Sequence, residues 1–395
     1  MKLKITIMII GIMLLFTACG DKKNDIKNED ETIDTIVEDN LSQYKETNLD
    51  LNKYSVINAD NKDARTYFPW FNLGCSDYGY YYKSDNDFIY FFDKNAKKSV
   101  PLCNKAECEH CDEQCNAYFN RTYHLSYIQY YDGNVYTLSY SMDGYVYLSK
   151  ISEDGSSREQ YMTLYKQELT TTDGGTNYRF PEICIHRDYV YFVIPKEETP
   201  KLYRMKLGGE ELEVVFELKG ERASIYRIRP YGDFVFFQAG HFADDTMVDM
   251  NAGIFAINVN SGEMTLVVDD AMATYVVADN ILYYDNREGI YSKDLSEGNR
   301  QKIVDVATKW DFSADGKYIY IENATGDGIK VYNLDGEYIR SINPLSKQQI
   351  SKHFYGDGTY LFAYSLVDNE TREEKMAYFD INNMLDEESG WNYCD

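Results

Sequence analysis

The feature that most constrains the fold is a structural unit that recurs seven times along the 395-residue chain. In each copy a hydrophobic first strand is followed by a turn containing Asp, Asn or Gly and then by an aromatic-rich second strand. The seven aromatic strands are YGYYYKS (78–84), YDGNVYTL (131–138), HRDYVYFV (186–193), YGDFVFF (231–237), ADNILYYD (278–285), ADGKYIYIE (314–322) and GDGTYLFAY (356–364). Their opening turns recur every 36 to 55 residues.

A third-strand candidate follows each aromatic strand, and turns such as EDGSS, LGGEE, NSGEM and LDGEY lead from four of these into a fourth strand. A twisted four-stranded sheet cannot bury both faces alone, so copies at this period stack face to face and close into a ring. We therefore predict an all-β fold: a single β-propeller over residues 53–395 with seven four-stranded blades, six or eight being the alternatives. A β-sandwich followed by a second β domain is the competing arrangement, and seven copies in phase argue against it.

The composition is typical of a large β protein with an ample core. The chain has 38 Tyr and only 7 Pro, and 44% of its residues are hydrophobic. Tyrosine suits half-buried pleated surfaces, where its ring packs and its hydroxyl stays wet. The formal net charge of −25 and the lack of a basic patch argue against nucleic acid as a partner. We expect a monomer whose ligand is a protein, a peptide or a glycan.

The N-terminus has the pattern of an export signal. Lys2 and Lys4 precede an apolar run over residues 5–16. At about a dozen residues, this run is too short to span a membrane core, which takes about 20. The pattern predicts a signal peptide over residues 1–18.

The segment FTACG (16–20) resembles the lipobox of bacterial lipoproteins, although Phe16 stands where that motif usually has Leu. The resemblance implies cleavage before Cys19 and a diacylglycerol thioether on this cysteine. The lipid would hold the protein at the extracytoplasmic face of the cell membrane. An ordinary cleaved signal peptide that contains a cysteine is the alternative.

Residues 19–52 are dense in Asp, Glu, Asn and Lys and hold one aromatic residue, Tyr44. Low hydrophobicity combined with high charge predicts a disordered acidic tether. A flexible segment of this length reaches about 30 Å. The alternative is an extension that packs onto the body, mainly after Leu41.

Four cysteines and a histidine fall within residues 103–115, the segment that we call the Cys loop. They are Cys103, Cys108, His110, Cys111 and Cys115. Local disulfides would suit an exported protein, whereas three or four thiolates with or without the imidazole would suit a structural zinc ion. The C-x4-C-x2-C-x3-C spacing lacks the long spacer of a zinc ribbon, and a reduced or redox-active loop is a third interpretation. We expect no other cofactor.

Three more cysteines lie outside this loop. Cys75 and Cys184 fall on the first strands of the first and third units beside apolar neighbours, which predicts buried, inert thiols. Cys394 could be paired or free.

One copy of the repeat, WDFSADGKYIYIEN (310–323), resembles the repeat of TolB-type propellers, whose core is a strand, Ser-x-Asp-Gly-Lys and another strand. Ala314 stands where that family usually has proline. The matching residues are Trp310, Ser313, Asp315, Gly316 and Lys317. As a whole the chain looks like propeller lipoproteins of Gram-positive anaerobes, which are distantly similar to lipoprotein-receptor propellers and carry a similar cysteine loop. The resemblance implies an exported, membrane-tethered propeller and does not supply a ligand.

No catalytic motif stands out in the sequence. It contains no G-x-S-x-G elbow, no H-E-x-x-H and no P-loop. The histidines fall in different repeats, at His110, His124, His186, His241 and His353. We therefore predict a non-enzymatic binding module that uses the Cys loop and the insertions 168–178 and 241–253. The alternatives are a propeller lyase or glycosidase acting on a surface polysaccharide, and a metal- or redox-responsive sensor.

Overall fold

The structure is a computed structural model. It describes residues 40–57, 73–84, 87–119, 124–168, 170–172, 175–177, 181–243, 250–271, 274–286, 288–305, 312–322, 328–343, 350–368 and 373–394. These residues belong to one compact unit, Val37–Asp395. The predicted signal peptide (1–18), Cys19 and Trp310 lie outside the described residues.

The described strands form seven four-stranded antiparallel sheets and one two-stranded hairpin. Blade 1 consists of β1 (Leu73–Cys75), β2 (Gly79–Lys83), β3 (Ile89–Asp93) and β4 (Lys98–Pro101). Blade 2 consists of β5 (His124–Tyr131), β6 (Asn134–Tyr140), β7 (Tyr145–Ser152) and β8 (Arg158–Lys166). The hairpin of β9 (Thr170–Thr172) and β10 (Gly175–Asn177) follows, within the predicted insertion 168–178.

The other five blades follow in sequence order. Blade 3 consists of β11 (Glu182–His186), β12 (Tyr189–Val193), β13 (Lys201–Lys206) and β14 (Leu212–Glu217). Blade 4 consists of β15 (Ala223–Tyr231), β16 (Phe234–Phe242), β17 (Met250–Asn258) and β18 (Met264–Ala271). Blade 5 consists of β19 (Tyr275–Ala278), β20 (Ile281–Asp285), β21 (Ile290–Asp294) and β22 (Arg300–Val304).

Blade 6 consists of β23 (Phe312–Ala314), β24 (Tyr318–Glu322), β25 (Ile329–Asn333) and β26 (Tyr338–Ile342). Blade 7 consists of β27 (Ile350–Gly356), β28 (Tyr360–Asp368), β29 (Glu373–Asp380) and β30 (Asn392–Tyr393). The helical elements of the described residues are the short 3-10 turns η1 (Leu41–Gln43) and η2 (Ile381–Asn383). None of the described segments is a helix long and apolar enough to cross a bilayer.

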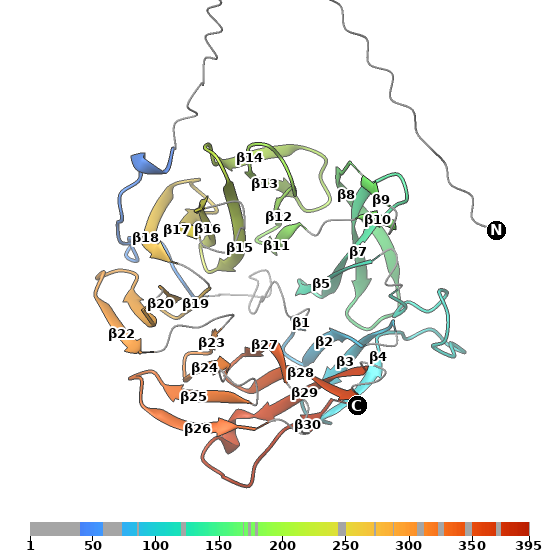
Figure 1. The fold of residues 1–395 in the computed structure, drawn as a ribbon. Coiled ribbons are helices and arrows are strands. Elements are labelled where there is room, and N and C mark those ends of the chain that lie inside the picture. The colour runs from blue at the N-terminus through green and yellow to red at the C-terminus, as the bar shows by residue number, and fades with distance from the viewer. Residues whose placement is uncertain are drawn as a thin grey trace, which may run out of the picture. The chain divides into compact units, whose positions relative to one another are not determined.

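The blades form a ring in which the first strand of each sheet lies nearest the centre (Figure 1). The seven aromatic segments predicted from the sequence all coincide with or overlap the second strands, β2, β6, β12, β16, β20, β24 and β28. The predicted all-β, seven-bladed propeller is therefore confirmed.

The core is divided into seven hydrophobic clusters, one between each pair of neighbouring blades. Tyrosines of the second strands fill these interfaces, and Tyr80, Tyr191, Tyr284 and Tyr320 are nearly or completely buried. Each blade thus buries both faces against its neighbours, which explains why polar–apolar alternation is imperfect in these strands.

The Asp-Gly turns have a local physical cause. In the turn between β23 and β24, the Asp315 carboxylate accepts hydrogen bonds from the backbone N–H groups of Lys317 and Tyr318, both at 2.9 Å. Gly316 takes a φ of +79°, which glycine adopts without the steric cost of a side chain. Asp357 accepts bonds of the same length in the turn between β27 and β28.

The ring closes between blades 7 and 1, which are built from separate segments of the chain and share none of the described strands. Aromatic rings fill this interface: the centroids of Tyr80 and Phe362 lie 4.5 Å apart, and those of Phe92 and Tyr378 lie 5.0 Å apart. Cys394 is fully buried in this cluster, and its carbonyl oxygen accepts a hydrogen bond from Ser99 Oγ at 2.5 Å.

Residues 40–57 lie against blades 3, 4 and 5 beside β18 (Figure 1). The Asn40 side chain donates to the Glu217 carbonyl oxygen at 2.9 Å, and the Thr47 N–H donates to the Leu266 carbonyl oxygen at 2.9 Å. The prediction of a disordered tether is therefore wrong for residues 40–52, and the compact body begins before residue 53. The reason is that Tyr44, Leu49 and neighbouring apolar side chains pack into interblade clusters despite the acidic composition of the segment.

Candidate metal centre and adjoining groove

The Cys loop connects β4 of blade 1 to β5 of blade 2, and turns hold it in a compact form. The N–H of Cys108 donates to the Lys105 carbonyl oxygen at 3.3 Å, and the N–H of Cys115 donates to the Asp112 carbonyl oxygen at 3.1 Å. Glu107 and His110 take positive φ angles of 65° and 52°. These turns reverse the chain so that residues distant in the loop face one another.

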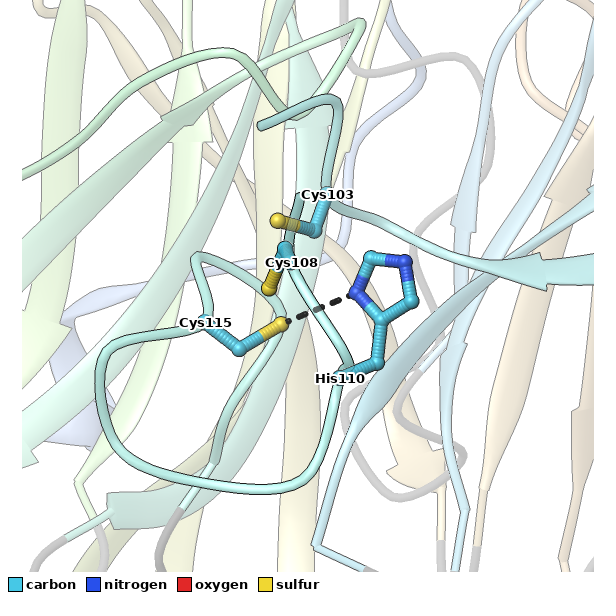
Figure 2. A group of neighbouring side chains, drawn as sticks. All are labelled: Cys103, Cys108, His110 and Cys115. Atoms are coloured by element: carbon cyan, nitrogen blue, oxygen red, sulfur yellow. Dashed lines mark hydrogen bonds between the residues drawn. The ribbon is translucent and has the colours of Figure 1, made fainter. Parts of the chain in front are cut away.

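The fold brings together four of the five predicted ligands. One ligand atom from each of Cys103, Cys108, His110 and Cys115 lies within 4.8 Å of all the others. We call these four residues the Cys–His cluster. Within the cluster, His110 Nδ1 and Cys115 Sγ lie 3.4 Å apart (Figure 2).

Cys111 does not belong to the cluster, and its inclusion among the predicted ligands is not supported by the geometry. Its side chain is exposed, one residue beyond His110 in the loop. Sequence spacing could not exclude it, because spacing does not contain the backbone angles of the loop, such as the φ of 52° at His110, that set where each side chain points. None of the seven cysteines in the described part of the chain forms a disulfide, so the local disulfides considered above are not seen there.

The thiols of the cluster lie in different electrostatic environments. Burial would raise the pKa of Cys103, but hydrogen bonds from the N–H groups of Lys105 and Asn116 and from the neighbouring thiols outweigh it and lower the pKa. Burial and the crowding of Cys103 and Cys108 raise the pKa of Cys115 to about 12, against a stabilising N–H from Ala117. The Cys103 thiol therefore ionises more readily than the Cys115 thiol.

Blade 2 supports both ends of the loop. The carbonyl oxygen of Gly155, in the turn between β7 and β8, accepts hydrogen bonds from the Asn104 N–H at 3.2 Å and from Asn116 Nδ2 at 2.8 Å. Gly155 has a φ of +70°, and an added Cβ would lie 2.6 Å from backbone atoms of Leu102 and Cys103. The guanidinium of Arg158 donates to the Tyr118 carbonyl oxygen and interacts favourably with a Cys115 thiolate.

Three sulfurs and one imidazole nitrogen can bind a metal ion. Soft thiolate ligands with an imidazole are typical of tetrahedral structural sites, in which protein atoms fill all four positions. The geometry thus permits a closed metal centre at the junction of blades 1 and 2.

A groove of about 770 Å³ adjoins this junction. Blade 1 contributes Tyr78, Phe91 and Val100 to its lining, and the turn between β7 and β8 contributes Glu153 and Asp154. Leu102, Cys103 and Asn104 line the same groove. The metal candidate and the groove therefore share a segment of backbone.

The two thiols predicted to be buried on first strands lie on β1 and β11. Cys184 is fully buried, whereas Cys75 is only partly buried. Burial raises the pKa of Cys184, as expected for an inert thiol. The prediction for Cys75 is thus only partly correct.

The histidines lie in separate blades. His186 on β11 is fully buried, with Nε2 2.7 Å from the Gly232 carbonyl oxygen. His241 on β16 has Nδ1 2.9 Å from the Glu221 carbonyl oxygen. His124 and His353 lie on β5 and β27, and their side chains are outside the described part of the structure.

Sequence reasoning missed the residues that support the candidate site from outside it. Gly155 was identified only as part of an EDGSS turn, and Asn116 and Arg158 had no assigned role. No local pattern could have revealed them, because their contacts join parts of the chain that are about 40 residues apart.

The sequence comparisons identify no family: no protein-family model matches the chain, and no curated protein matches its sequence. Solved structures do match its fold. A prolyl endopeptidase matches with a TM-score of 0.52 and 12% identity, covering 81% of this chain and 48% of that chain. A puromycin hydrolase matches with a TM-score of 0.53 and 10% identity, covering 86% of this chain and 56% of that chain.

TolB from Acinetobacter baumannii is also among the matched structures, with a TM-score of 0.39 and 13% identity, covering 81% of this chain and 80% of that chain. The chain spans about half the length of the two hydrolases. At 12% and 10% identity, the likeness to the two hydrolases shows the β-propeller fold alone, and this fold hosts both binding proteins and enzymes.

Proposed function

We propose that this protein is an extracytoplasmic lipoprotein, anchored to the membrane through Cys19, whose propeller binds a protein, a peptide or a cell-wall glycan. We also propose that the Cys–His cluster holds a structural metal ion, with zinc as the natural occupant. The anchor rests on the lipobox-like FTACG segment. The proposed role is binding without catalysis, because the sequence carries none of the catalytic motifs sought above.

The observation that carries the binding function is the groove between blades 1 and 2. Tyr78 and Val100, which line it, are 66% and 56% exposed, although both are large hydrophobic side chains. The volume of about 770 Å³ falls in the range of ligand pockets, about 300–1,000 Å³. Tyrosine offers an apolar face for stacking and a hydroxyl for hydrogen bonding, which suits peptides and sugars.

The anchor is tested by metabolic labelling with palmitate in a bacterial host. We expect the wild-type chain to incorporate the label and to fractionate with membranes, and the Cys19→Ala variant to lose both properties. Cys111→Ala, which removes an exposed thiol of the folded body, is the matched control and should behave as wild type. Labelling of the Cys19→Ala variant would refute the lipidation site.

The groove is tested by selecting ligands from a displayed random-peptide library and a glycan array with the mature protein. Tyr78→Ala should weaken binding of the selected ligands at least tenfold. Tyr338 on β26 is 55% exposed and lies outside the groove, so Tyr338→Ala is the matched control. Failure to enrich any ligand, or equal loss in both variants, would contradict the groove as the binding site.

A further inference from the structure

We propose that a zinc ion bound by Cys103, Cys108, His110 Nδ1 and Cys115 acts as a cross-link that fixes one wall of the groove between blades 1 and 2. This inference rests on the structural metal ion proposed above. It adds the ligating atoms, the residue that stays outside the site, and the mechanical connection to the candidate binding surface.

The choice of zinc follows from the ligand atoms. In a tetrahedral site, Zn–S distances of about 2.3 Å and Zn–N distances of about 2.0–2.1 Å place neighbouring ligand atoms about 3.5–3.8 Å apart. The 3.4 Å between His110 Nδ1 and Cys115 Sγ is close to this value. The limit of 4.8 Å over the whole group means that shifts of about 1 Å in the side chains would complete the tetrahedron.

Backbone amides are placed to stabilise the thiolates of such a site. The backbone N–H groups of Lys105 and Ala117 lie near the sulfurs of Cys103 and Cys115, each two residues beyond its cysteine. Hydrogen-bond partners beside metal ligands orient them. The cationic Arg158 close to Cys115 offsets the net negative charge of one zinc ion with three thiolates.

The mechanical role follows from where the four ligands lie in the chain. Cys103 is next to Asn104, and Cys115 is next to Asn116; both asparagines donate hydrogen bonds to the Gly155 carbonyl oxygen. A metal ion that joins Cys103 to Cys115 therefore holds the two donors together on one acceptor. This acceptor belongs to the turn 152–157 of blade 2.

The same turn supplies Glu153 and Asp154 to the groove, while Leu102 and Cys103 line it from the Cys loop. The metal ligands, the two asparagines and the groove wall thus form one connected set of contacts. Without the ion, residues 103–115 would keep their turn hydrogen bonds, the contacts with Gly155 and the packing of their cysteines against the cluster between blades 1 and 2. They would lose the link that joins all four ligands, so the loop should become more mobile.

The first test is metal analysis of the full-length mature protein, purified in detergent without added metal. We expect one zinc ion per chain by mass spectrometry, falling below a tenth of an ion in Cys108→Ser. Cys111→Ser is the matched control and should retain one ion, since Cys111 lies outside the cluster. After exchange, Co²⁺ should give the absorption of a tetrahedral thiolate site. Full occupancy in Cys108→Ser, or its loss in Cys111→Ser, would overturn the ligand set.

The second test is hydrogen exchange of the wild-type protein before and after zinc is removed with a chelator and then restored. We expect the turn 152–157 to exchange at least tenfold faster without zinc and to recover when zinc is added back. The equivalent turn of blade 4, 258–263, is the internal control and should not change. Because the wild-type sequence is used, misfolding of a variant cannot produce this result.

The two tests separate the cross-linking role of the zinc ion from the presence of a structural metal ion. Zinc bound in the expected stoichiometry with unchanged exchange in 152–157 would refute the cross-link and leave the structural metal ion standing. The absence of any bound metal would refute both. Ligand binding through Tyr78 is measured separately and survives either result.

Discussion

Lys293 on β21 holds an ammonium group in the interior with a side chain only 1% exposed. Its Nζ donates to Glu46 Oε1 at 2.7 Å and to the Val267 carbonyl oxygen at 2.6 Å. Glu46 belongs to the N-terminal segment 40–57 and also pairs with Arg300 of β22. The Glu46→Ala variant would leave the buried ammonium with a single carbonyl partner.

The expected cost follows from this burial. Removing one member of a fully buried ion pair costs about 3–5 kcal/mol. The side chain of Glu46 is 24% exposed and that of Arg300 is 30% exposed, so water can partly replace the missing carboxylate. We therefore expect Glu46→Ala to lower the free energy of unfolding by about 2 kcal/mol, between the buried and surface limits.

The assay is urea unfolding of the mature chain, followed by tyrosine fluorescence and by circular dichroism. Glu159→Ala is the control, because its partner Lys150 lies 4.0 Å away and the Glu159 side chain is 62% exposed. It should cost less than about 0.5 kcal/mol. Adding Lys293→Met to Glu46→Ala should restore most of the loss, since the orphaned charge is then removed. The reasoning would be refuted if Glu46→Ala lowered the free energy of unfolding by less than about 0.5 kcal/mol, or if the double variant did not regain it.

Three further predictions concern the junction of blades 1 and 2 and the closure of the ring. Gly155→Ala should lower the free energy of unfolding, measured by thermal denaturation, by about 2–3 kcal/mol, because the positive φ and backbone atoms 2.6 Å away both oppose a Cβ. In the control variant Gly133→Ala, the φ is +72° but the space around the Cβ is open, so the loss should be only about 1 kcal/mol. Hydrogen bonds from Ser156 and Ser152 lower the pKa of Asp154 to about 2. The pKa of Asp154 in the folded state lies below its value in the unfolded chain. The ionised carboxylate therefore stabilises the fold fully above about pH 4, and this contribution is lost as the pH falls toward 2. An NMR titration of the Asp154 carboxyl should show the low pKa, and a midpoint near pH 4 would contradict the prediction. Phe362 is fully buried between blades 7 and 1, so Phe362→Ala should lower the free energy of unfolding in urea by about 3–5 kcal/mol. Lys97→Ala removes the exposed ion pair to Asp380 and should lower it by less than about 1 kcal/mol. Comparable losses in the two variants would refute aromatic packing as the main cause of ring closure.

Most of the fold could be predicted from the sequence because every copy of the repeat contains recognisable turn and strand patterns. Each Asp-Gly turn encodes a local hydrogen-bond pattern, as Asp315 and Asp357 show. Each aromatic strand encodes a surface that must be covered on both faces. These two patterns placed the second strand correctly in every blade. Seven such units in sequence can cover all their faces by closing into a ring.

The acidic segment 40–52 was misjudged because composition averages over a window, whereas packing depends on individual side chains. Tyr44 contacts Phe255 with ring centroids 5.4 Å apart, and Leu49 is 4% exposed in the cluster between blades 4 and 5. Two anchoring side chains of this kind outweigh the charge around them, together with backbone hydrogen bonds to blades 4 and 5 and the bond from the Asn40 side chain to blade 3.

The sequence by itself determined the all-β architecture, favoured seven blades over six or eight, and supplied the residue types of a candidate metal site, because these follow from short-range patterns of turns, strands and cysteines. Only the tertiary structure decided that Cys111 lies outside the Cys–His cluster and that Gly155 of the next blade joins both ends of the Cys loop. It alone also showed that the ring closes on aromatic packing rather than on a shared strand. These outcomes depend on backbone angles at single residues and on contacts between distant segments, neither of which a linear pattern contains.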